Sequence, residues 1–201
     1  MDVILLLLSI LASYLLGAVP FGLLFTRFFS NIDVRTIGSG NIGATNVMRA
    51  AGKKAAILTL LADAFKGLVP VLIVKALFHD ETMTILEGVA AILGHNFPIY
   101  LKFKGGKGVA TSYGVVLGIA PLIGLFCLLI WLLAAFLWRY SSLAALVSFA
   151  FYPILTFSLN SASKPYAMLS LFIFGMIYFR HRENLKRLLA GTEQQIGKNK
   201  K

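Results

Sequence analysis

Long apolar runs alternate with short polar segments along this chain. Residues 3–25 and 122–138 carry no charged side chain, and an uncharged apolar run of about 18 residues can cross a bilayer as a helix. The pattern predicts seven membrane-spanning helices. They cover residues 3–28, 55–78, 83–96, 108–120, 122–139, 142–159 and 165–179.

Two of these predicted spans are short. Segments 83–96 and 108–120 cannot cross about 30 Å of hydrocarbon unaided, so five or six spans are the main alternative. The break at Ala120–Pro121 favours two separate helices over one kinked helix, because proline has no backbone N–H to donate.

The basic residues predict the orientation. If the N-terminus lies outside, 16 of the 19 Lys and Arg residues fall on the inner side, two fall outside, and Lys66 lies within a span. The acidic residues Asp2, Asp80 and Glu81 fall outside. Because inner loops are enriched in Lys and Arg, we expect an external N-terminus and a cytoplasmic C-terminus.

Composition supports a membrane protein. Of 201 residues, 58% are hydrophobic and only 13% are charged, whereas soluble domains carry about 25% charged residues. The net charge of +11 lies in loops between apolar runs, which excludes a nucleic-acid-binding face. We therefore predict an all-α polytopic membrane bundle over residues 1–190 and a loose polar tail over residues 191–201.

No metal or organic cofactor is expected. The three His residues and the single Cys127 are scattered along the chain, with none of the spacings typical of metal sites. Cys127 lies within an apolar run and is expected to pack there as a thiol.

The first polar segment, residues 38–49, has the sequence GSGNIGATNVMR. Its glycines allow successive backbone amides to converge on an anion, and arginine can bind a phosphate through two parallel hydrogen bonds. The alternative is a flexible loop with helix caps. The candidate anion-binding residues are Ser39, Asn41, Gly43, Thr45, Asn46 and Arg49.

The second polar segment ends one predicted span and begins the next. Lys104, Gly105, Gly106 and Lys107 form a turn flanked by two lysines, which suits a phosphate but could also be an ordinary inner loop. It is not a Walker A motif, because Gly108 stands where Ser or Thr should follow the lysine. ATP binding is therefore not implied.

Four further residues near this segment are possible site residues. His95 and Asn96 end the preceding span, and Asp63 and Lys66 share one face of another. Because charges inside a membrane are costly and usually functional, the carboxylate and ammonium either pair structurally or line the site. Both interpretations remain open.

The third polar segment, residues 180–184, begins where the last span leaves the membrane. Its arginines could simply anchor the helix at lipid headgroups. His181 and Asn184 lie three residues apart and share a helix face, and histidine is well suited to proton transfer near neutral pH. The predicted topology places all three polar segments on the cytoplasmic side, which indicates one composite site for a phosphorylated substrate.

The order of these motifs resembles the bacterial acyl-phosphate:glycerol-3-phosphate acyltransferases, the PlsY family. The matching stretches are GSGNIGATNVMRAAG, GHNFPIYLKFKGGKGVAT and RHRENLKRL. The resemblance implies transfer of a fatty acyl group from acyl-phosphate to the 1-hydroxyl of glycerol 3-phosphate. The products would be lysophosphatidic acid and phosphate, made at the cytoplasmic face of the bacterial inner membrane during phospholipid synthesis. Besides membrane lipids and the two substrates, it implies no obligate protein partner.

Direct attack of the acceptor hydroxyl on the acyl carbonyl suits these residues. Ser39, His181 and Asn184 are the catalytic candidates, and the residues of the first two segments would bind phosphate. Either His181 or a substrate phosphate would serve as general base. The residues five positions after the three histidines are not acidic, so a His-x4-Asp pair is absent; they are Thr84, Tyr100 and Lys186.

Two other classes of function compete with this interpretation. A transporter of organic phosphates would also need spans and phosphate-binding groups, but its site is expected near the midplane between internal repeats. No repeat is apparent, and the polar segments gather at one interface. A structural membrane protein would leave the composition of the three motifs unexplained.

Overall fold

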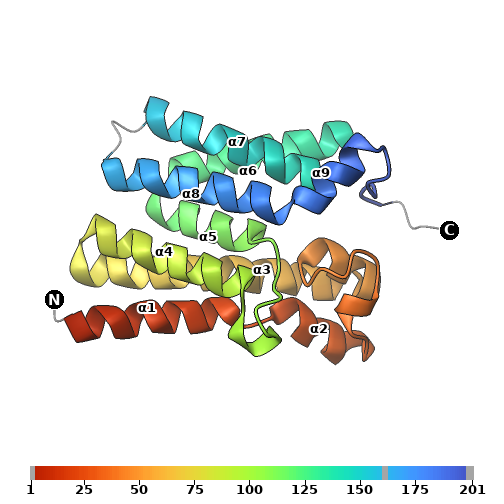
Figure 1. Cartoon of the computed structure of the whole chain (residues 1–201), viewed down its shortest axis with the longest axis horizontal. Coiled ribbons are helices and arrows are strands. Elements are labelled where there is room, and N and C mark those ends of the chain that lie inside the picture. The colour runs from red at the N-terminus through yellow and green to blue at the C-terminus, as the bar shows by residue number, and fades with distance from the viewer. Residues whose placement is uncertain (1–2, 160–162, 198–201) are drawn as a thin grey trace. The chain divides into compact units, whose positions relative to one another are not determined.

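The computed structural model describes residues 3–159 and 163–197, and the regular elements within them are all helical. The predicted all-α fold is confirmed. The α-helices are α1 (Val3–Ala18), α2 (Phe21–Ser30), α3 (Ala44–Phe78), α4 (Glu81–Asn96), α5 (Val109–Ile119), α6 (Pro121–Trp138), α7 (Ser141–Leu159), α8 (Lys164–Arg180) and α9 (Arg182–Leu189), with short 3-10 helices η1 (Val34–Thr36) and η2 (Ile99–Leu101) (Figure 1). Asp2, Lys198, Lys200 and Lys201, whose side of the membrane was predicted from the sequence, lie outside the described residues.

The chain divides into two compact units, Met1–Ile119 and Ala120–Lys201. The boundary falls where the sequence predicted a break between two helices. Helix α5 ends at Ile119 and α6 begins at Pro121, a position where the missing proline N–H costs no helical hydrogen bond. The expectation of two helices here is confirmed.

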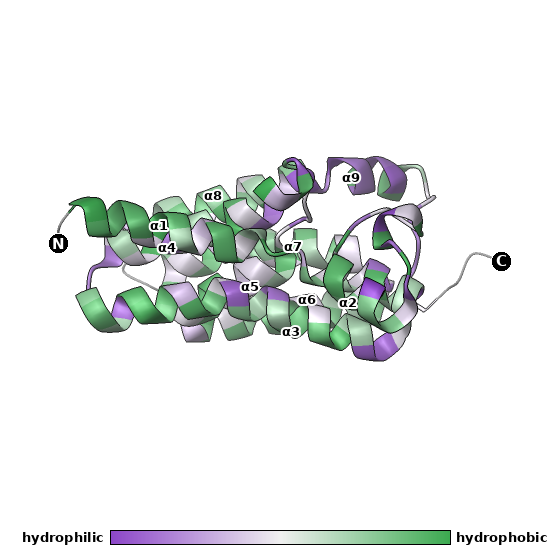
Figure 2. Cartoon of the chain, turned by 90° about the horizontal axis from the view of Figure 1, so that it is seen from below, coloured by the Kyte–Doolittle hydropathy of each residue, from purple (hydrophilic) through white to green (hydrophobic). Residues whose placement is uncertain are grey.

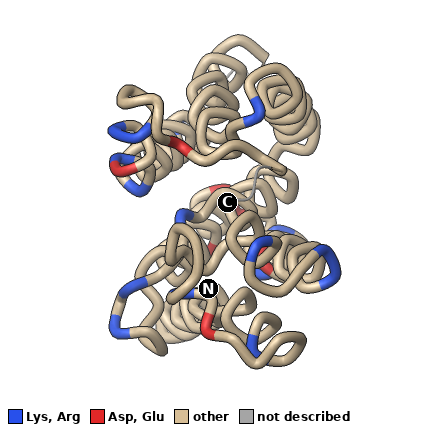
Figure 3. The backbone as a smooth tube through the Cα atoms, turned by 90° about the vertical axis from the view of Figure 1, so that its right-hand side faces the viewer, with Lys and Arg blue, Asp and Glu red and all other residues tan. Residues whose placement is uncertain are grey.

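Within residues 3–159 and 163–197, four helical stretches are long and apolar enough to cross a membrane. They are Val3–Ser30, Ala44–Phe78, Pro121–Trp138 and Ser141–Leu159, and α5 is a shorter apolar helix. Figure 2 shows the apolar character of most helices in green and the polar character of α9 in purple. Figure 3 shows long stretches of backbone that carry no charged residue. The count of seven spans and the orientation remain predictions.

The first predicted span, residues 3–28, is not one helix. Helix α1 ends at Ala18 and α2 begins at Phe21, because Pro20 has no N–H and obstructs the turn before it. The Val19 carbonyl at this break accepts a hydrogen bond from the Lys66 ammonium at 2.9 Å. The Lys66 ammonium is thus a second donor to a carbonyl that also accepts the Phe21 backbone N–H at 3.1 Å.

The second predicted span, residues 55–78, is preceded by helical turns that the sequence did not predict. Helix α3 covers Ala44–Phe78, but the non-helical Gly52 at φ 79° marks a kink, so the predicted span corresponds to the part of α3 after that kink. The helix therefore starts within the first polar segment and places Thr45, Asn46 and Arg49 on its opening turns.

Glycines allow close helix contacts in the first unit. A Cβ atom built at Gly17 would lie 2.2 Å from the Ala91 carbonyl oxygen, so α1 and α4 meet backbone to backbone. A Cβ atom at Gly114 would lie 2.0 Å from the Ala64 oxygen, which brings α5 equally close to α3. Gly118, four residues later on α5, faces the Val71 side chain of α3, where a Cβ atom would lie 2.9 Å from Val71 Cγ1. Small residues spaced in this way are the usual means of close helix approach in membranes.

Glu87 of α4 is fully buried, with 0% of its surface exposed. Ser9 Oγ of α1 donates to one carboxylate oxygen at 2.6 Å, and Ser13 Oγ donates to the other. The carboxylate is therefore buried in the contact between α1 and α4.

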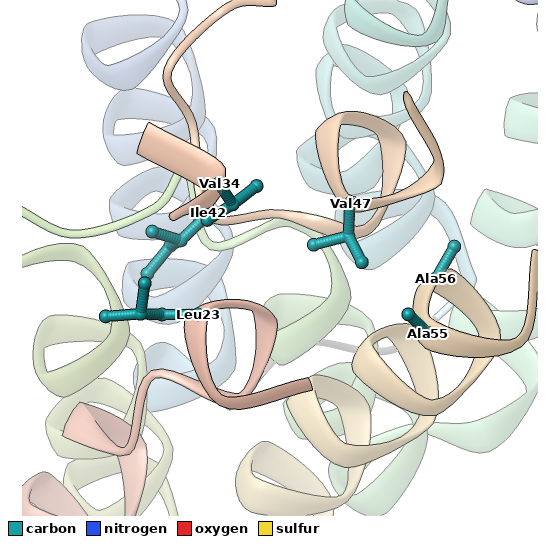
Figure 4. Packing of buried hydrophobic residues seen from close by; sticks show 6 residues of the cluster. All are labelled: Leu23, Val34, Ile42, Val47, Ala55 and Ala56. Atoms are coloured by element: carbon teal, nitrogen blue, oxygen red, sulfur yellow. The ribbon is translucent and has the colours of Figure 1, made fainter. Parts of the chain in front are cut away.

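An apolar cluster fixes the first polar segment to the helices beside it. Its members come from α2, η1, α3 and the connecting loop: Leu23, Val34, Ile42, Val47, Ala55 and Ala56 (Figure 4). Leu101 of η2 packs against the same cluster. The first two polar segments are therefore linked through one core within the first unit.

Helices α6, α7 and α8 pack in sequence in the second unit. Ser148 Oγ of α7 donates to the Cys127 carbonyl of α6 at 2.6 Å. Beyond α9, the Ile196 N–H donates to the Arg139 carbonyl at 2.7 Å. This hydrogen bond joins the described part of the chain after α9 to the residue that follows α6.

Candidate active site

Asn46 organises the loop formed by the first polar segment. Only 2% of the residue is exposed. Its Oδ1 atom accepts the Ser39 N–H at 3.1 Å. Its amide nitrogen lies 2.9–3.0 Å from the carbonyl oxygens of Val34, Ile37 and Asn41. Asn46 therefore fixes the shape of the loop through hydrogen bonds between its buried side-chain amide and the loop backbone.

Two glycines in this loop adopt left-handed backbone conformations. Gly38 has φ 56° and Gly40 has φ 69°, values at which a side chain would be strained. Asn41 Oδ1 accepts the Gly43 N–H at 2.8 Å, which closes the turn before α3. Such alternating conformations can direct successive amides toward an anion.

The polar side chains of the first segment differ in exposure. Ser39 and Thr45 are exposed, while Asn41 and Arg49 are half-buried. A Cβ atom at Gly38 would lie 3.5 Å from Arg49 Cδ, so the arginine side chain runs beside the glycine loop. Ser39, Arg49 and the loop amides are thus brought together.

Asp33 and Arg35 brace the chain just before this loop. Arg35 Nε donates to Asp33 Oδ1 at 2.9 Å, and the Arg35 backbone N–H donates to the same atom at 3.0 Å. The side-chain hydrogen bond from Arg35 holds the pKa of the Asp33 carboxyl well below its usual range. Asp33 therefore stays ionised and ties up one arginine near the proposed anion site.

The second polar segment turns tightly over the end of α4. The Gly106 N–H donates to the His95 carbonyl at 3.1 Å. A Cβ atom at Gly105 would lie 2.2 Å from that same oxygen, and one at Gly108 would lie 2.8 Å from Asn96 Oδ1. His95 and Asn96 thus support the glycine turn. Of its flanking lysines, Lys104 is exposed and Lys107 is half-buried.

A buried ionic cluster lies behind this turn. Lys66 Nζ is 2.7 Å from Asp63 Oδ1, and His95 Nδ1 is 3.6 Å from the same oxygen. The structure therefore shows the mutual Asp63–Lys66 pair that the sequence allowed, and adds His95 to it.

His181 and Asn184 occupy the junction of α8 and α9 in the second unit. His181 is 3% exposed and Asn184 is 5% exposed. The His181 Nδ1 atom lies 2.8 Å from the Ile177 carbonyl. Because a carbonyl only accepts, Nδ1 carries the hydrogen, and Nε2 is the acceptor nitrogen of the neutral ring.

Glu193 is a residue that the sequence analysis missed. Its carboxylate accepts hydrogen bonds from Asn184 Nδ2 and Ser142 Oγ, both at 2.6 Å, and from Arg187 Nε at 2.7 Å. Burial alone would raise the pKa of this carboxyl, but these three hydrogen bonds outweigh it and lower the pKa. The available signal was that Glu193 is the one acidic residue after Glu183 in an otherwise basic C-terminal stretch.

Comparison with known proteins identifies the family. A sequence model of the glycerol-3-phosphate acyltransferases matches residues 7–191. The chain belongs to the glycerol-3-phosphate acyltransferase family. It therefore acylates glycerol 3-phosphate, a reaction of phospholipid biosynthesis.

Curated relatives of this acyltransferase match it along nearly the whole chain. The glycerol-3-phosphate acyltransferase of Agrobacterium fabrum is 51% identical over 193 residues, which cover 96% of this chain and 93% of the relative. That of Mesorhizobium japonicum is 50% identical over 192 residues and covers 96% of both chains.

Solved structures of PlsY (YgiH), an integral membrane glycerol 3-phosphate acyltransferase, share the fold. The glycerol 3-phosphate form has a TM-score of 0.90 and 39% identity, with 96% of both chains covered. The lysophosphatidic acid form has a TM-score of 0.88 and the same identity, with 96% of this chain and 95% of that chain covered. The predicted integral membrane helical fold is confirmed.

Proposed function

We propose that this acyltransferase takes its acyl group from acyl-phosphate and releases lysophosphatidic acid and inorganic phosphate. The observation that carries the proposal is the pairing of two basic, glycine-bearing segments in one unit. Residues 38–49 and 104–108 are joined through the cluster against which Leu101 packs. Donor and acceptor each carry a phosphate, so two such segments match two anionic substrates.

The reaction needs no covalent enzyme intermediate. The 1-hydroxyl oxygen of glycerol 3-phosphate attacks the acyl carbonyl carbon and forms the new ester bond. The bond between that carbon and the donor's phosphate oxygen breaks, and inorganic phosphate leaves with its electron pair. The hydroxyl proton passes to a base. Because acyl-phosphate is already activated, the protein mainly positions two anions and stabilises developing charge.

The loop amides and Arg49 form the first proposed phosphate-binding group. Gly38 and Gly40 provide the backbone geometry, and Ser39 offers an exposed hydroxyl beside them. We assign Asn46 to holding this geometry, since its amide already contacts the loop backbone. Ser39, Asn41, Gly43 and Thr45 then contact the donor phosphate or the oxyanion.

Lys104 and Lys107 form the second proposed group, on either side of Gly105 and Gly106. The lysine charges attract phosphate, and the glycine turn lets the backbone approach it closely. The absence of a side chain at both glycines is required by the packing against α4.

His181 and Asn184 are proposed to orient the acceptor. The His181 Nδ1–H contact with Ile177 fixes the tautomer in which Nε2 can accept a proton. Its competitor as general base is a substrate phosphate oxygen. Asn184 is held through Glu193, which makes that carboxylate a positioning group.

We also propose the cellular location. The family resemblance implies the bacterial inner membrane, and the distribution of basic residues favours an orientation with the three polar segments facing the cytoplasm. A water-soluble acceptor would enter from that side, while the acyl chain of the donor remains in hydrocarbon.

The decisive experiment supplies the purified protein in lipid with acyl-phosphate and glycerol 3-phosphate. Inorganic phosphate and lysophosphatidic acid are measured together, with acyl-coenzyme A as the competing donor. We expect equal amounts of both products only with acyl-phosphate. Arg49→Ala should lower the rate by about 100-fold or more, since a phosphate-binding charge is lost, while the exposed Lys54→Ala on α3 should match the wild type.

Other outcomes would change the assignment. Turnover with acyl-coenzyme A but not with acyl-phosphate would overturn the assignment of acyl-phosphate as the donor. Phosphate release without acylated product would indicate hydrolysis. Flux of phosphate esters into sealed vesicles without turnover would favour a transporter.

A further inference from the structure

We infer that His95, anchored by Asp63 and Lys66, is a positioning residue that shapes the Gly105–Gly106 turn for phosphate binding. The inference deepens the proposed function, since it assumes that this turn contacts a substrate phosphate. It assigns His95 a role through the turn, without direct contact with the reacting atoms.

The anchor is a charged cluster sealed inside the first unit. Asp63 and Lys66 are each 3% exposed, and His95 is 4% exposed. Asp63 Oδ1 lies between the two cationic or ionisable groups, 2.7 Å from Lys66 Nζ and 3.6 Å from His95 Nδ1. Burying such charges is costly, so their retention within a membrane protein indicates a function.

Lys66 also links the buried cluster to the break between α1 and α2. Its ammonium donates to the Val19 carbonyl at 2.9 Å, at the break between α1 and α2. The cluster therefore joins three helical segments at the position of the imidazole. A side chain held in this way has little freedom to change rotamer.

The opposite edge of the imidazole lies against the turn. A Cβ atom at Gly106 would lie 2.0 Å from His95 Nε2, 2.8 Å from Cε1 and 3.0 Å from Cδ2. The His95 backbone carbonyl meanwhile accepts the Gly106 N–H at 3.1 Å. Backbone and side chain of one residue thus support the same glycine from two directions.

This geometry favours a structural role over proton transfer. A general base must reach the proton that it removes, directly or through a water. The Nδ1 side of His95 faces Asp63, and the Nε2 side faces the Gly106 backbone. The ring therefore lies buried between Asp63 and Gly106, where it acts as a support for the turn.

A size-swap cycle tests this directly. Gly106→Ala alone should raise the KM for glycerol 3-phosphate by about tenfold or more, with kcat changed much less, because the new methyl group displaces the turn. In His95→Ala/Gly106→Ala, the missing imidazole leaves room for that methyl group. If the two substitutions acted independently, their effects on the KM for glycerol 3-phosphate would multiply. We expect the KM of the double variant to be lower than that product by about fivefold or more.

Gly105→Ala provides the matched control. Its Cβ atom would meet the His95 backbone oxygen at 2.2 Å, which His95→Ala leaves in place. His95→Ala/Gly105→Ala should therefore show no rescue. Rescue of both glycine variants alike, or of neither, would overturn the inference.

His95→Gln supplies a second test that avoids a large cavity. A loss confined to kcat, with unchanged KM, would make His95 a proton-transfer group and overturn the positioning role. Calorimetric binding of glycerol 3-phosphate to the full chain in lipid separates this result from the donor assignment. Weaker binding in Gly106→Ala, restored in the double variant, supports the inference whichever acyl donor the enzyme uses.

Discussion

Asn46 holds Ser39 in position across the first polar segment: its Oδ1 atom accepts the Ser39 N–H at 3.1 Å. The same side chain donates to the loop carbonyls of Val34, Ile37 and Asn41. One buried amide group at the start of α3 therefore sets the conformation of the loop that carries the proposed catalytic serine.

Replacing Asn46 should uncouple this loop from α3. Asn46→Asp keeps an acceptor for Ser39 but removes the donors and places negative charge beside three carbonyl oxygens. We expect destabilisation of about 1–3 kcal/mol and a large fall in acylation rate. Thermal unfolding in lipid and the rate of lysophosphatidic acid formation check both. Activity equal to wild type would show that the loop keeps its shape without Asn46. The exposed Thr45→Ala should leave stability unchanged.

Glu193 should make the second unit sensitive to acid. Its folded-state pKa lies below the ordinary value of 4.5, so its stabilising effect is complete above that value and is lost as pH falls through the folded-state pKa. Glu193→Gln should lower the unfolding temperature near neutral pH, by the equivalent of about 1–3 kcal/mol, and reduce the acid-dependent loss. Unfolding temperatures measured from pH 7 to pH 3 provide the check.

Glu183 is the control for this experiment. Its side chain is 59% exposed and pairs with the surface cations Arg182 and Lys186. An exposed pair contributes about 0–1 kcal/mol, so Glu183→Gln should resemble wild type at every pH. Equal losses in both glutamate variants would argue against a special role for Glu193.

Gly114→Ala should disrupt the contact between α3 and α5. The added Cβ atom would meet the Ala64 carbonyl oxygen at 2.0 Å, and forced packing of this kind costs about 1–3 kcal/mol. Gly175→Ala on α8 is the matched control, because nothing lies within 4 Å of its Cβ position. We expect a lower unfolding temperature for the first variant and no decrease for the second. A decrease of equal size in both would assign the effect to glycine flexibility rather than contact.

The orientation can be tested by labelling introduced cysteines. Cys127 is buried, and a Cys127→Ala background removes the native thiol. A membrane-impermeant maleimide applied to intact cells should label Glu81→Cys, which the charge distribution places outside. Lys186→Cys should react only after permeabilisation. The reverse pattern would overturn the predicted topology while leaving the fold unaffected.

Apolar runs and charge placement were enough to predict an all-helical membrane fold, and the missing N–H of Pro121 predicted the break there. The break at Pro20 was not predicted, although that proline offers the same signal. The helical turns before the Gly52 kink in α3 were also missed, since residues 44–51 include polar side chains typical of a loop. Local composition therefore failed to predict the helix boundaries in the first polar segment, which is part of the proposed site.

Side-chain chemistry showed a similar division. Glycine, arginine and lysine content indicated the anion-binding segments, and the spacing of Asp63 and Lys66 correctly allowed an ion pair. The approach of His95 to that pair depends on how α3 packs against α4, which no local pattern records. The contacts of Glu193 with Ser142, 51 positions away, likewise arise only from tertiary folding.

The two serines that hold Glu87 bear on how the polypeptide enters the bilayer during synthesis. Ser9 lies 78 positions before the glutamate, so α1 is made long before α4. Helix α1 has no charged residue and can insert alone, whereas α4 brings a carboxylate that hydrocarbon disfavours. Because α1 is synthesised first, the hydroxyl groups of Ser9 and Ser13 can already be in the membrane when α4 inserts. They can then donate hydrogen bonds to the Glu87 carboxylate as soon as α4 packs against α1.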